Sequence, residues 1–307
     1  MKRQHLYGVI AILIWSTAAP TAKSLLSGLP NYEAIAIPCL FAAAFMLTVN
    51  VFGGKLRQLR RCSAKELAVM AGLGVLGPFL NAAFYYEGLT RLSSQEACVM
   101  NYLWPIMLVL FSVLLLGEKM TGAKAAAMLC SFAGVAVMSS GEASHFGGGR
   151  LTGIVCCILG AVCYGLFSVL NKKANLDQTV TMMVLWPTTA ACALLAGALT
   201  ETWVPIRGMQ WLGLAWLGIA SNAVAYLLWA LALGGERETA FIANLAYLTP
   251  FLSVVISAIF LKEGLQLRAL AALVLIVGGI LLQNVHRPKT AHIPAARRVP
   301  AAKEETP

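Results

Sequence analysis

Long apolar runs recur along the whole chain, and they restrict its possible folds more than any other feature. A helix that spans a bilayer needs ~20 consecutive, mostly apolar residues. Only 12% of the 307 residues are charged, whereas about 25% are charged in a typical soluble domain. The runs predict an all-α membrane protein with ten transmembrane helices, at roughly residues 6–27, 32–52, 66–88, 94–116, 121–139, 151–170, 178–198, 210–232, 238–261 and 268–285.

The segments between these runs are too short to hold a soluble domain. Residues 286–307 are rich in proline, alanine and charge, so we expect a disordered cytoplasmic tail there. The first run follows Lys2 and Arg3 and contains "STAAPTA", features shared with cleaved signal peptides. Its apolar character continues through Leu25 and Leu26, which predicts a retained helix instead.

The net charge of +10 is distributed unevenly across the predicted membrane. If the N-terminus is cytoplasmic, the basic residues of the outside loops are Arg91, Arg150, Arg207, Lys262 and Arg268. Nearly all other lysines and arginines then lie on the cytoplasmic side, which predicts that both termini are cytoplasmic. Attraction to anionic lipids accounts for this basic character. We therefore expect the lipid bilayer, and no nucleic acid, as a partner.

Motifs for metals, cofactors and enzyme chemistry are weak in this chain. The eight cysteines form no CxxC pair, and all but Cys62 lie in apolar runs. This placement predicts that they are small buried side chains and bind no metal. The stretch "GLGVLG" (72–77) fits a dinucleotide fingerprint, but it lies inside a predicted span instead of after a strand. No H-E-x-x-H or G-x-S-x-G motif occurs. The sequence predicts no metal, no cofactor and no enzyme.

The chain repeats itself after a shift of 145 residues. The stretch "NYLWPIMLVLFSVLLLGE" then lies on "AYLTPFLSVVISAIFLKE", and the shift pairs Tyr102 with Tyr247, Pro105 with Pro250 and Glu118 with Glu263. Each copy holds five spans, an odd number, so the second copy enters the membrane from the opposite side. This predicts two inverted five-helix repeats, at 1–140 and 151–285, around a central cavity. The alternative is that apolar helices merely resemble one another.

Four spans carry an asparagine with an aromatic residue on the same helix face. The pairs at helical spacing are Asn81 with Tyr85, Asn101 with Trp104, Asn222 with Tyr226 and Trp229, and Asn244 with Tyr247. Polar residues in a span usually face the bundle interior or water. These stripes predict a shared cavity, whereas the alternative reading is asparagine bonds that join helices, at ~0.6 kcal/mol each.

The prolines of the repeated stretch predict interrupted helices beside this cavity. A proline lacks the amide hydrogen, and its ring crowds the carbonyl four residues earlier. Pro105 and Pro250 therefore free the carbonyls of Asn101 and Ala246. Irregular backbone at membrane depth is tolerated where it lines a cavity, so we expect Pro105 and Pro250 to act as hinges.

Lys23 is the only charged residue placed well inside a predicted span. One alternative is that it extends to the nearby membrane surface; another is that it meets a substrate carboxylate or a helix C-terminus. All acidic residues and histidines lie at span ends, in loops or in the tail. No mid-membrane carboxylate or histidine is available as a proton carrier, which favours downhill transport.

Three motifs in order resemble the drug/metabolite transporter superfamily, and its EamA branch in particular. They are "IWSTAAPTAKSLL" (14–26), "WPIMLVLFSVLLLGEK" (104–119) and "LTPFLSVVISAIFLKE" (248–263). The branch often has a tryptophan and a lysine in its first span, here Trp15 and Lys23. The stretch "MNYLWP" is similar to one in bacterial aromatic amino acid exporters, and the resemblance implies a helix basket with spans five and ten peripheral.

The resemblance implies export of amino acids or related metabolites from a bacterial cell by alternating access. It places Tyr85, Tyr102 and Trp104 in the cavity, while Thr249 stands where the first repeat has Trp104, so a symmetric site is doubtful. The expected cavity residues are Trp15, Lys23, Asn81, Tyr85, Asn101, Tyr102, Trp104, Tyr164, Asn222, Tyr226, Trp229, Asn244 and Tyr247.

We expect an inner-membrane exporter of a small molecule, an aromatic or large apolar amino acid. The alternative is an exporter of cationic drugs or quaternary amines from the same superfamily. The sequence leaves the oligomeric state open, a monomer included.

Overall fold

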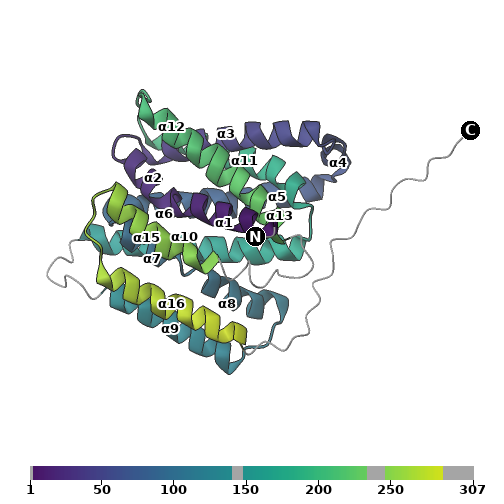
Figure 1. Cartoon of the computed structure of the whole chain (residues 1–307). Coiled ribbons are helices and arrows are strands. Elements are labelled where there is room, and N and C mark those ends of the chain that lie inside the picture. Colours follow the sequence, from purple (N-terminus) through teal and green to yellow (C-terminus); the bar gives the residue numbers. More distant parts are fainter. Residues whose placement is uncertain (1–2, 140–147, 234–245, 286–307) are drawn as a thin grey trace, which may run out of the picture.

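The computed structural model describes residues 3–139, 148–233 and 246–285, and within these ranges the chain forms helices and no strand (Figure 1). Its first part contains α1 (Arg3–Ser16), α2 (Ala18–Leu26), α3 (Asn31–Phe52), α4 (Leu56–Arg61), α5 (Ala64–Gly74), η1 (Val75–Phe79), α6 (Leu80–Arg91), α7 (Ser94–Asn101), α8 (Trp104–Leu116) and α9 (Gly122–Ser139). Its second part contains α10 (Gly148–Ala174), α11 (Gln178–Thr200), α12 (Met209–Ala215), η3 (Trp216–Val224), α13 (Ala225–Leu233), η4 (Ala246–Leu248), α15 (Thr249–Phe260) and α16 (Leu267–Val285). The predicted all-helical class is confirmed.

Several helical stretches are long and apolar enough to cross a membrane. In the described ranges there are 7, namely Arg3–Leu26, Asn31–Phe52, Ala64–Arg91, Ser94–Leu116, Gly149–Ala174, Gln178–Thr200 and Met209–Trp229. Three shorter apolar helices lie where the sequence predicts spans five, nine and ten: Gly122–Met138, Ala246–Phe260 and Leu267–Leu281. The chain is an integral membrane protein, and the number of ten spans stays a prediction.

The repeated proline motif coincides with interrupted helices. Helix α7 ends at Asn101, four residues before Pro105, and α8 begins after a short turn. In the second copy, Pro250 is the second residue of α15. The carbonyl of Ala246, four residues earlier, accepts a hydrogen bond from the Tyr102 hydroxyl at 3.1 Å. A side chain in the first part of the chain therefore satisfies a carbonyl that proline frees in the second part.

The first span is also interrupted, which the sequence reading did not anticipate. Helix α1 ends at Ser16, four residues before Pro20, and α2 begins at Ala18. The same ring-to-carbonyl crowding explains the break. The Ser16 hydroxyl bonds back to the Ile12 carbonyl at 2.7 Å. The short turn between α1 and α2 bends the span beside Trp15.

Two spans that the predicted repeat makes equivalent contain π-helical segments. In the third span, η1 directly precedes α6, and in the eighth span η3 joins α12 to α13. Such segments are uncommon and are frequent at functional sites. Asn81 is the second residue of α6, and Asn222 lies inside η3. Both widened segments therefore position an asparagine predicted to face the cavity.

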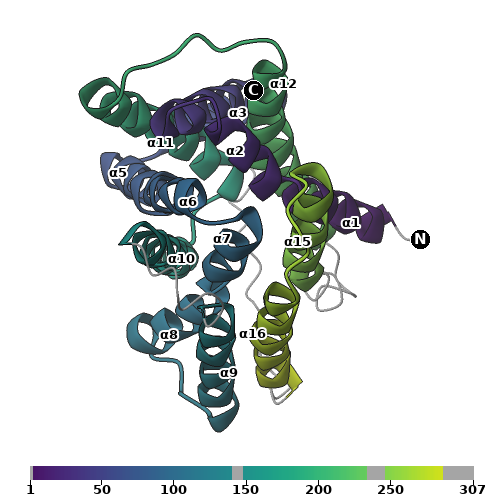
Figure 2. The same ribbon diagram turned by 90° about the vertical axis from the view of Figure 1, so that its left-hand side faces the viewer.

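Helices α9 and α16 pack along each other at one edge of the molecule, far from α3 and α11 (Figures 1 and 2). Two glycines allow the close approach. A Cβ on Gly134 would lie 2.8 Å from the Ala272 carbonyl oxygen, and one on Gly279 would lie 3.0 Å from that of Ala127. The 145-residue shift pairs these two glycines with each other, so this contact uses positions that the predicted repeat makes equivalent.

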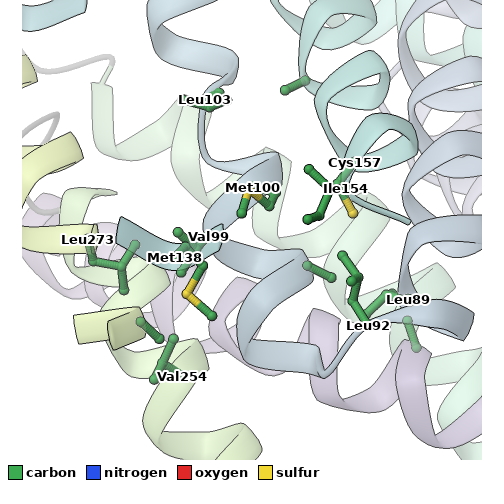
Figure 3. Packing of buried hydrophobic residues seen from close by; sticks show 14 of the residues in the cluster. Leu89, Leu92, Val99, Met100, Leu103, Met138, Ile154, Cys157, Val254 and Leu273 are labelled. Carbon is green, nitrogen blue, oxygen red and sulfur yellow. The ribbon is translucent and has the colours of Figure 1, made fainter. Parts of the chain in front are cut away.

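The largest apolar core joins helices from both parts of the chain, as Figure 3 shows. Leu89, Met100, Cys157, Val254 and Leu273 are among its buried members. Lipid tails are as apolar as these side chains, so close packing instead of water exclusion holds such helices together. This core lies beside the interrupted α7–α8 segment and fixes its position.

The two ends of the helix bundle differ. One end holds α4 and is called the α4 end; the other holds α12 and the turn after α2 and is called the α12 end (Figure 1). The connection between α10 and α11 lies at the α4 end, because Lys55 before α4 pairs with Asp177 before α11 at 3.5 Å. These names are used below.

Candidate functional site

Two adjoining cavities lie between the spans. The first has a volume of about 390 Å³ and the second about 360 Å³. Both are lined by Asn81, Tyr85, Asn101, Tyr164 and Tyr226. Further residues of the first are Tyr86, Asn171, Gln178, Thr181, Trp186 and Asn222. Further residues of the second are Trp15, Tyr102, Trp104, Trp229, Thr249 and Pro250.

Amide groups are concentrated where the cavities meet. The Asn81 side chain donates to the Gly160 carbonyl at 3.0 Å and to the Asn101 side-chain oxygen at 3.3 Å. These residues lie on α6, α10 and α7. The Nδ2 group of Asn101 has no partner among the described residues. It is therefore free to donate to a bound molecule.

Aromatic rings surround the second cavity. Trp15 packs against Tyr226 and Trp229, with ring centroids 5.1 and 5.5 Å apart. On the other side, Trp104 packs edge-on against Tyr164 at 5.2 Å. The Tyr164 and Tyr226 hydroxyls lie 3.1 Å apart and connect the two groups of rings. The result is a continuous aromatic wall between the cavities.

No charged residue lines either cavity within the described part of the chain. The buried polar groups in these walls that have no hydrogen-bond partner among the described residues include the Trp186 indole nitrogen and the Thr249 hydroxyl. An unpaired buried donor costs about 1–3 kcal/mol, so such groups call for a ligand or water. The cavities can receive a molecule that is neutral overall and has both polar and apolar parts.

The first cavity extends toward the α4 end. Its lining includes Asn171 near the end of α10 and Gln178 at the start of α11, whose side chains bond at 2.9 Å. Nearby, Glu118 after α8 accepts a hydrogen bond from Lys124 at 3.0 Å. That bond, with the charges of Lys124 and Lys172, lowers the pKa of Glu118. Glu118 is thus held as a carboxylate at this end of the bundle.

Hydrogen bonds between α7 and the end of α15 close the α12 end. The Ser94 amide donates to Glu263 at 2.9 Å, and the Ser94 and Ser257 hydroxyls lie 2.9 Å apart. Gln95 donates to the Gly264 carbonyl at 2.9 Å and accepts from the Gln266 amide at 3.0 Å. We call this set the α7–α15 seam. None of its residues lines either cavity.

Lys23 lies beside this seam. Its ammonium group donates to the carbonyls of Leu89 and Leu92, the latter at 2.7 Å. Both carbonyls belong to the C-terminal end of α6, where a cation is electrostatically favoured. Next to it, Arg150 pairs with Glu96 at 2.9 Å. Of the alternatives drawn from the sequence, the structure shows contact with a helix C-terminus.

The predicted cavity residues fall into three groups. Those that line a cavity are Trp15, Asn81, Tyr85, Asn101, Tyr102, Trp104, Tyr164, Asn222, Tyr226 and Trp229. Lys23 and Tyr247 do not line either one, and Tyr247 packs against the main core. Asn244 lies outside the described residues. Of the predicted hinges, Pro250 lines the second cavity and Pro105 is buried; whether either moves stays a prediction.

Sequence reasoning missed several residues of the first cavity. Trp186 had a signal, because "LWP" at 185–187 repeats the "LWP" at 103–105. Asn171 and Gln178 had a weaker sequence signal, because they are amides at the end of predicted span six and the start of predicted span seven. The predicted cavity rested on amides deep within a span, and these two lie at span ends. Nothing in the sequence distinguishes Thr181 from a surface threonine.

Comparison with known proteins decides the family. The profile of the EamA-like transporter family matches residues 2–140 and again residues 151–285. The chain belongs to this family. The family resemblance predicted from the motifs is confirmed, and the protein is a transporter instead of an enzyme.

Relatives cover nearly the whole chain. An aromatic amino acid exporter YddG of Ancylobacter novellus is 30% identical over 89% of this chain and 94% of its own. An uncharacterized transporter YvbV of Bacillus subtilis is 29% identical over 89% of this chain and 88% of its own. The aromatic amino acid exporter YddG of Escherichia coli is 25% identical over 92% of this chain and 97% of its own. One solved crystal structure, 26% identical, matches 92% of this chain and 99% of its own with a TM-score of 0.67.

Proposed function

We propose that this protein exports amino acids, with a preference for aromatic or large apolar ones, across the inner membrane of a bacterium. The observation that carries the proposal is the pair of uncharged cavities lined by amides and aromatic rings. Amides can donate to a carboxylate and accept from an ammonium group, and rings can pack on an apolar side chain. The relatives named as aromatic amino acid exporters support the same substrate class.

The proposed architecture has ten spans in two inverted repeats, residues 1–140 and 151–285, with 286–307 as a cytoplasmic tail. The two matches of the family profile support the repeat boundaries. The equivalent glycines of α9 and α16 and the two π-helical segments support the internal symmetry. An inverted repeat places the substrate between its halves near the membrane midplane, which fits a cavity lined by both parts of the chain.

The proposed mechanism is alternating access by rocking of the two repeats. The excess of basic residues on one side supports an orientation with the α4 end and both termini in the cytoplasm. In that orientation, the first cavity reaches the cytoplasmic end and the α7–α15 seam closes the outer end. The structure then corresponds to an inward-open conformation. Release outside would require the seam to separate while the α4 end closes.

Export of a cationic drug is the second candidate, because tryptophan and tyrosine rings also attract cations. No aspartate or glutamate lines the cavities in the described part of the chain, so a cation would lack a counter-charge. This favours a zwitterionic amino acid over a drug cation.

Flux into proteoliposomes tests both candidates. Purified protein is supplied with phenylalanine, tryptophan, methionine, alanine and a quaternary ammonium dye, with and without an imposed pH gradient. We expect faster flux of the three large amino acids than of alanine or the dye, and no requirement for the gradient. Transport of the dye alone, beside protein-free vesicles as control, would overturn the proposal.

A further inference from the structure

Helix α4 lies outside the candidate spans and is docked by its apolar face. It lies between the spans Asn31–Phe52 and Ala64–Arg91. Leu56 and Leu59, three residues apart, pack against a small buried cluster that contains Met70. The adjoining Lys55 pairs with Asp177 at the start of α11. Helix α4 is therefore held in a defined orientation at the surface of the bundle.

The opposite face of α4 carries three arginines. Arg57, Arg60 and Arg61 are spaced i, i+3 and i+4, so they share a face, and all three are exposed. None forms an ion pair or hydrogen bond with another described residue. We call these residues the basic face of α4.

Nearby carboxylates are already occupied. Glu66 accepts hydrogen bonds from the amide and hydroxyl of Ser63 in a capping box. Asp177 pairs with Lys55 and accepts two backbone amides at the start of α11. Among the residues that the structure describes, the basic face therefore has no carboxylate partner, and its positive charge is available to an external anion.

An exposed apolar residue lies at the end of α3, shortly before α4. Phe52, the last residue of α3, has 88% of its surface exposed. Because α3 is a candidate span, such a ring at its end lies where hydrocarbon meets headgroups. The surface thus combines an apolar ring at the boundary with arginines beyond it.

We propose that the basic face of α4 binds an anionic phospholipid, with the phosphate on Arg57, Arg60 and Arg61 and the acyl chains against Phe52. A guanidinium group binds phosphate through two parallel donors. The spans before and after α4 in the chain keep this helix at the membrane surface, where it is always close to lipid headgroups. A soluble polyanion would match the arginines but leave Phe52 without an apolar partner. This inference does not depend on the transported substrate.

The lipid surface also adjoins the mouth of the first cavity. Asp177, tied to the residue before α4, precedes Gln178, which lines that cavity. The Lys55–Asp177 ion pair would therefore connect a lipid-binding α4 to the opening through which the proposed substrate enters.

Native mass spectrometry of the full-length protein tests the proposal. The protein in a neutral detergent is titrated with phosphatidylglycerol and, separately, with phosphatidylcholine of the same acyl chains. We expect at least about tenfold tighter binding of phosphatidylglycerol, since each basic residue near a membrane surface contributes about fivefold. Raising the salt to 1 M should reduce this preference, because the Debye length falls to ~3 Å.

The matched variants remove three charges each. Arg57→Gln/Arg60→Gln/Arg61→Gln should lose the preference, whereas Arg3→Gln/Lys119→Gln/Lys173→Gln, which changes three exposed cations elsewhere, should keep it. A preference retained by the first variant would overturn the proposal. Equal binding of the two lipids by the unmodified protein would also overturn it, and this measurement does not depend on the folding of any variant. Tighter binding of a short RNA than of phosphatidylglycerol would also count against it.

Discussion

Asn101 occupies the point where the two cavities meet. Its side-chain oxygen accepts from Asn81, which also donates to the Gly160 carbonyl on α10. The network therefore joins helices of both proposed repeats. It leaves the Nδ2 group of Asn101 available to a carboxylate or carbonyl in the cavity.

Substitution Asn101→Ala should reduce flux by at least about tenfold, because it removes a hydrogen bond worth at least ~1.5 kcal/mol when the partner is charged. Expression and melting temperature should change little. Asn50→Ala is the matched control, since the buried Asn50 side chain bonds, among the described residues, only to the Met46 carbonyl of its own helix, at 2.6 Å. Flux per folded molecule in that control should equal the unmodified value. A similar loss of flux in both variants would mean that Asn101 serves only helix packing.

Thr249→Val tests the unpaired hydroxyl in the second cavity. The change keeps the side-chain shape and breaks no bond, so the melting temperature should not fall. If a substrate bonds to this hydroxyl, the KM for large amino acids should rise about fivefold, the effect of ~1 kcal/mol. Thr189→Val is the control, because Thr189 is buried and bonds to the Gly74 carbonyl at 3.0 Å. It should lower the melting temperature and leave KM unchanged, and the reverse pattern would contradict the assignment.

Residue spacing predicted much of the cavity lining, because an amide and a ring three or four positions apart share a helix face. For Lys23, spacing along the helix did not identify the contact partner. Its alternatives could not be separated by sequence, since the deciding contact is with carbonyls of Leu89 and Leu92, which are far along the chain. Asn171 and Gln178 were missed for a related reason. Their role depends on which end of the bundle the cavity reaches.

At the level of whole helices, α7 and α8 form a span with a break at its centre. The break is next to Asn101 and Trp104, both of which line the second cavity. A change in the angle between α7 and α8 would therefore move cavity residues directly.

Pro105→Ala restores an amide donor and should let α7 and α8 approach a continuous helix. If the break acts as a hinge, flux should fall about fivefold, which corresponds to a barrier higher by ~1 kcal/mol. Stability in detergent should stay equal or increase. Pro187→Ala is the control, because Pro187 lies inside the continuous helix α11 and lines neither cavity. Equal flux in the two variants would argue against a hinge at Pro105.

The long helices could be predicted from the apolar runs, and the break before Pro105 from the covalent constraint of proline. The same constraint applies to the break before Pro20. The π-helical segments η1 and η3 were not predictable, because a single extra residue per turn leaves no periodic pattern in a span that is apolar on all sides. Their positions are set by packing against neighbouring helices.

On the scale of the whole molecule, the structure is asymmetric along the bundle axis. Amides and aromatic rings line cavities that extend toward the α4 end, while buried polar contacts join α7 to the end of α15 at the other. Ser94 and Gln95 have 0% of their surface exposed. Ser94 and Gln95 are hydrogen-bonded while the seam is closed, whereas Glu263 Oε2 and Gln266 Oε1 are buried there without a partner among the described residues. Water could replace each of these bonds when the seam opens.

Gln95→Ala should therefore shift the protein toward an outward-open state. It removes both the bond to the Gly264 carbonyl and the bond from the Gln266 amide. Two bonds at ~1 kcal/mol each correspond to a change of up to about thirtyfold in the ratio of the two states. The native Cys98 reports this shift, because it lines the second cavity just inside the seam.

A membrane-impermeant maleimide applied to the outer side of oriented vesicles should modify Cys98 faster in Gln95→Ala than in the unmodified protein, with the site located by peptide mass spectrometry. Gln178→Ala is the control, since it removes the Asn171–Gln178 bond at the opposite end and should not expose Cys98 to the outside. If Cys98 reacts at the same rate in all three proteins, the seam does not control access. If it reacts faster only when the reagent is inside, the proposed orientation of the chain is reversed.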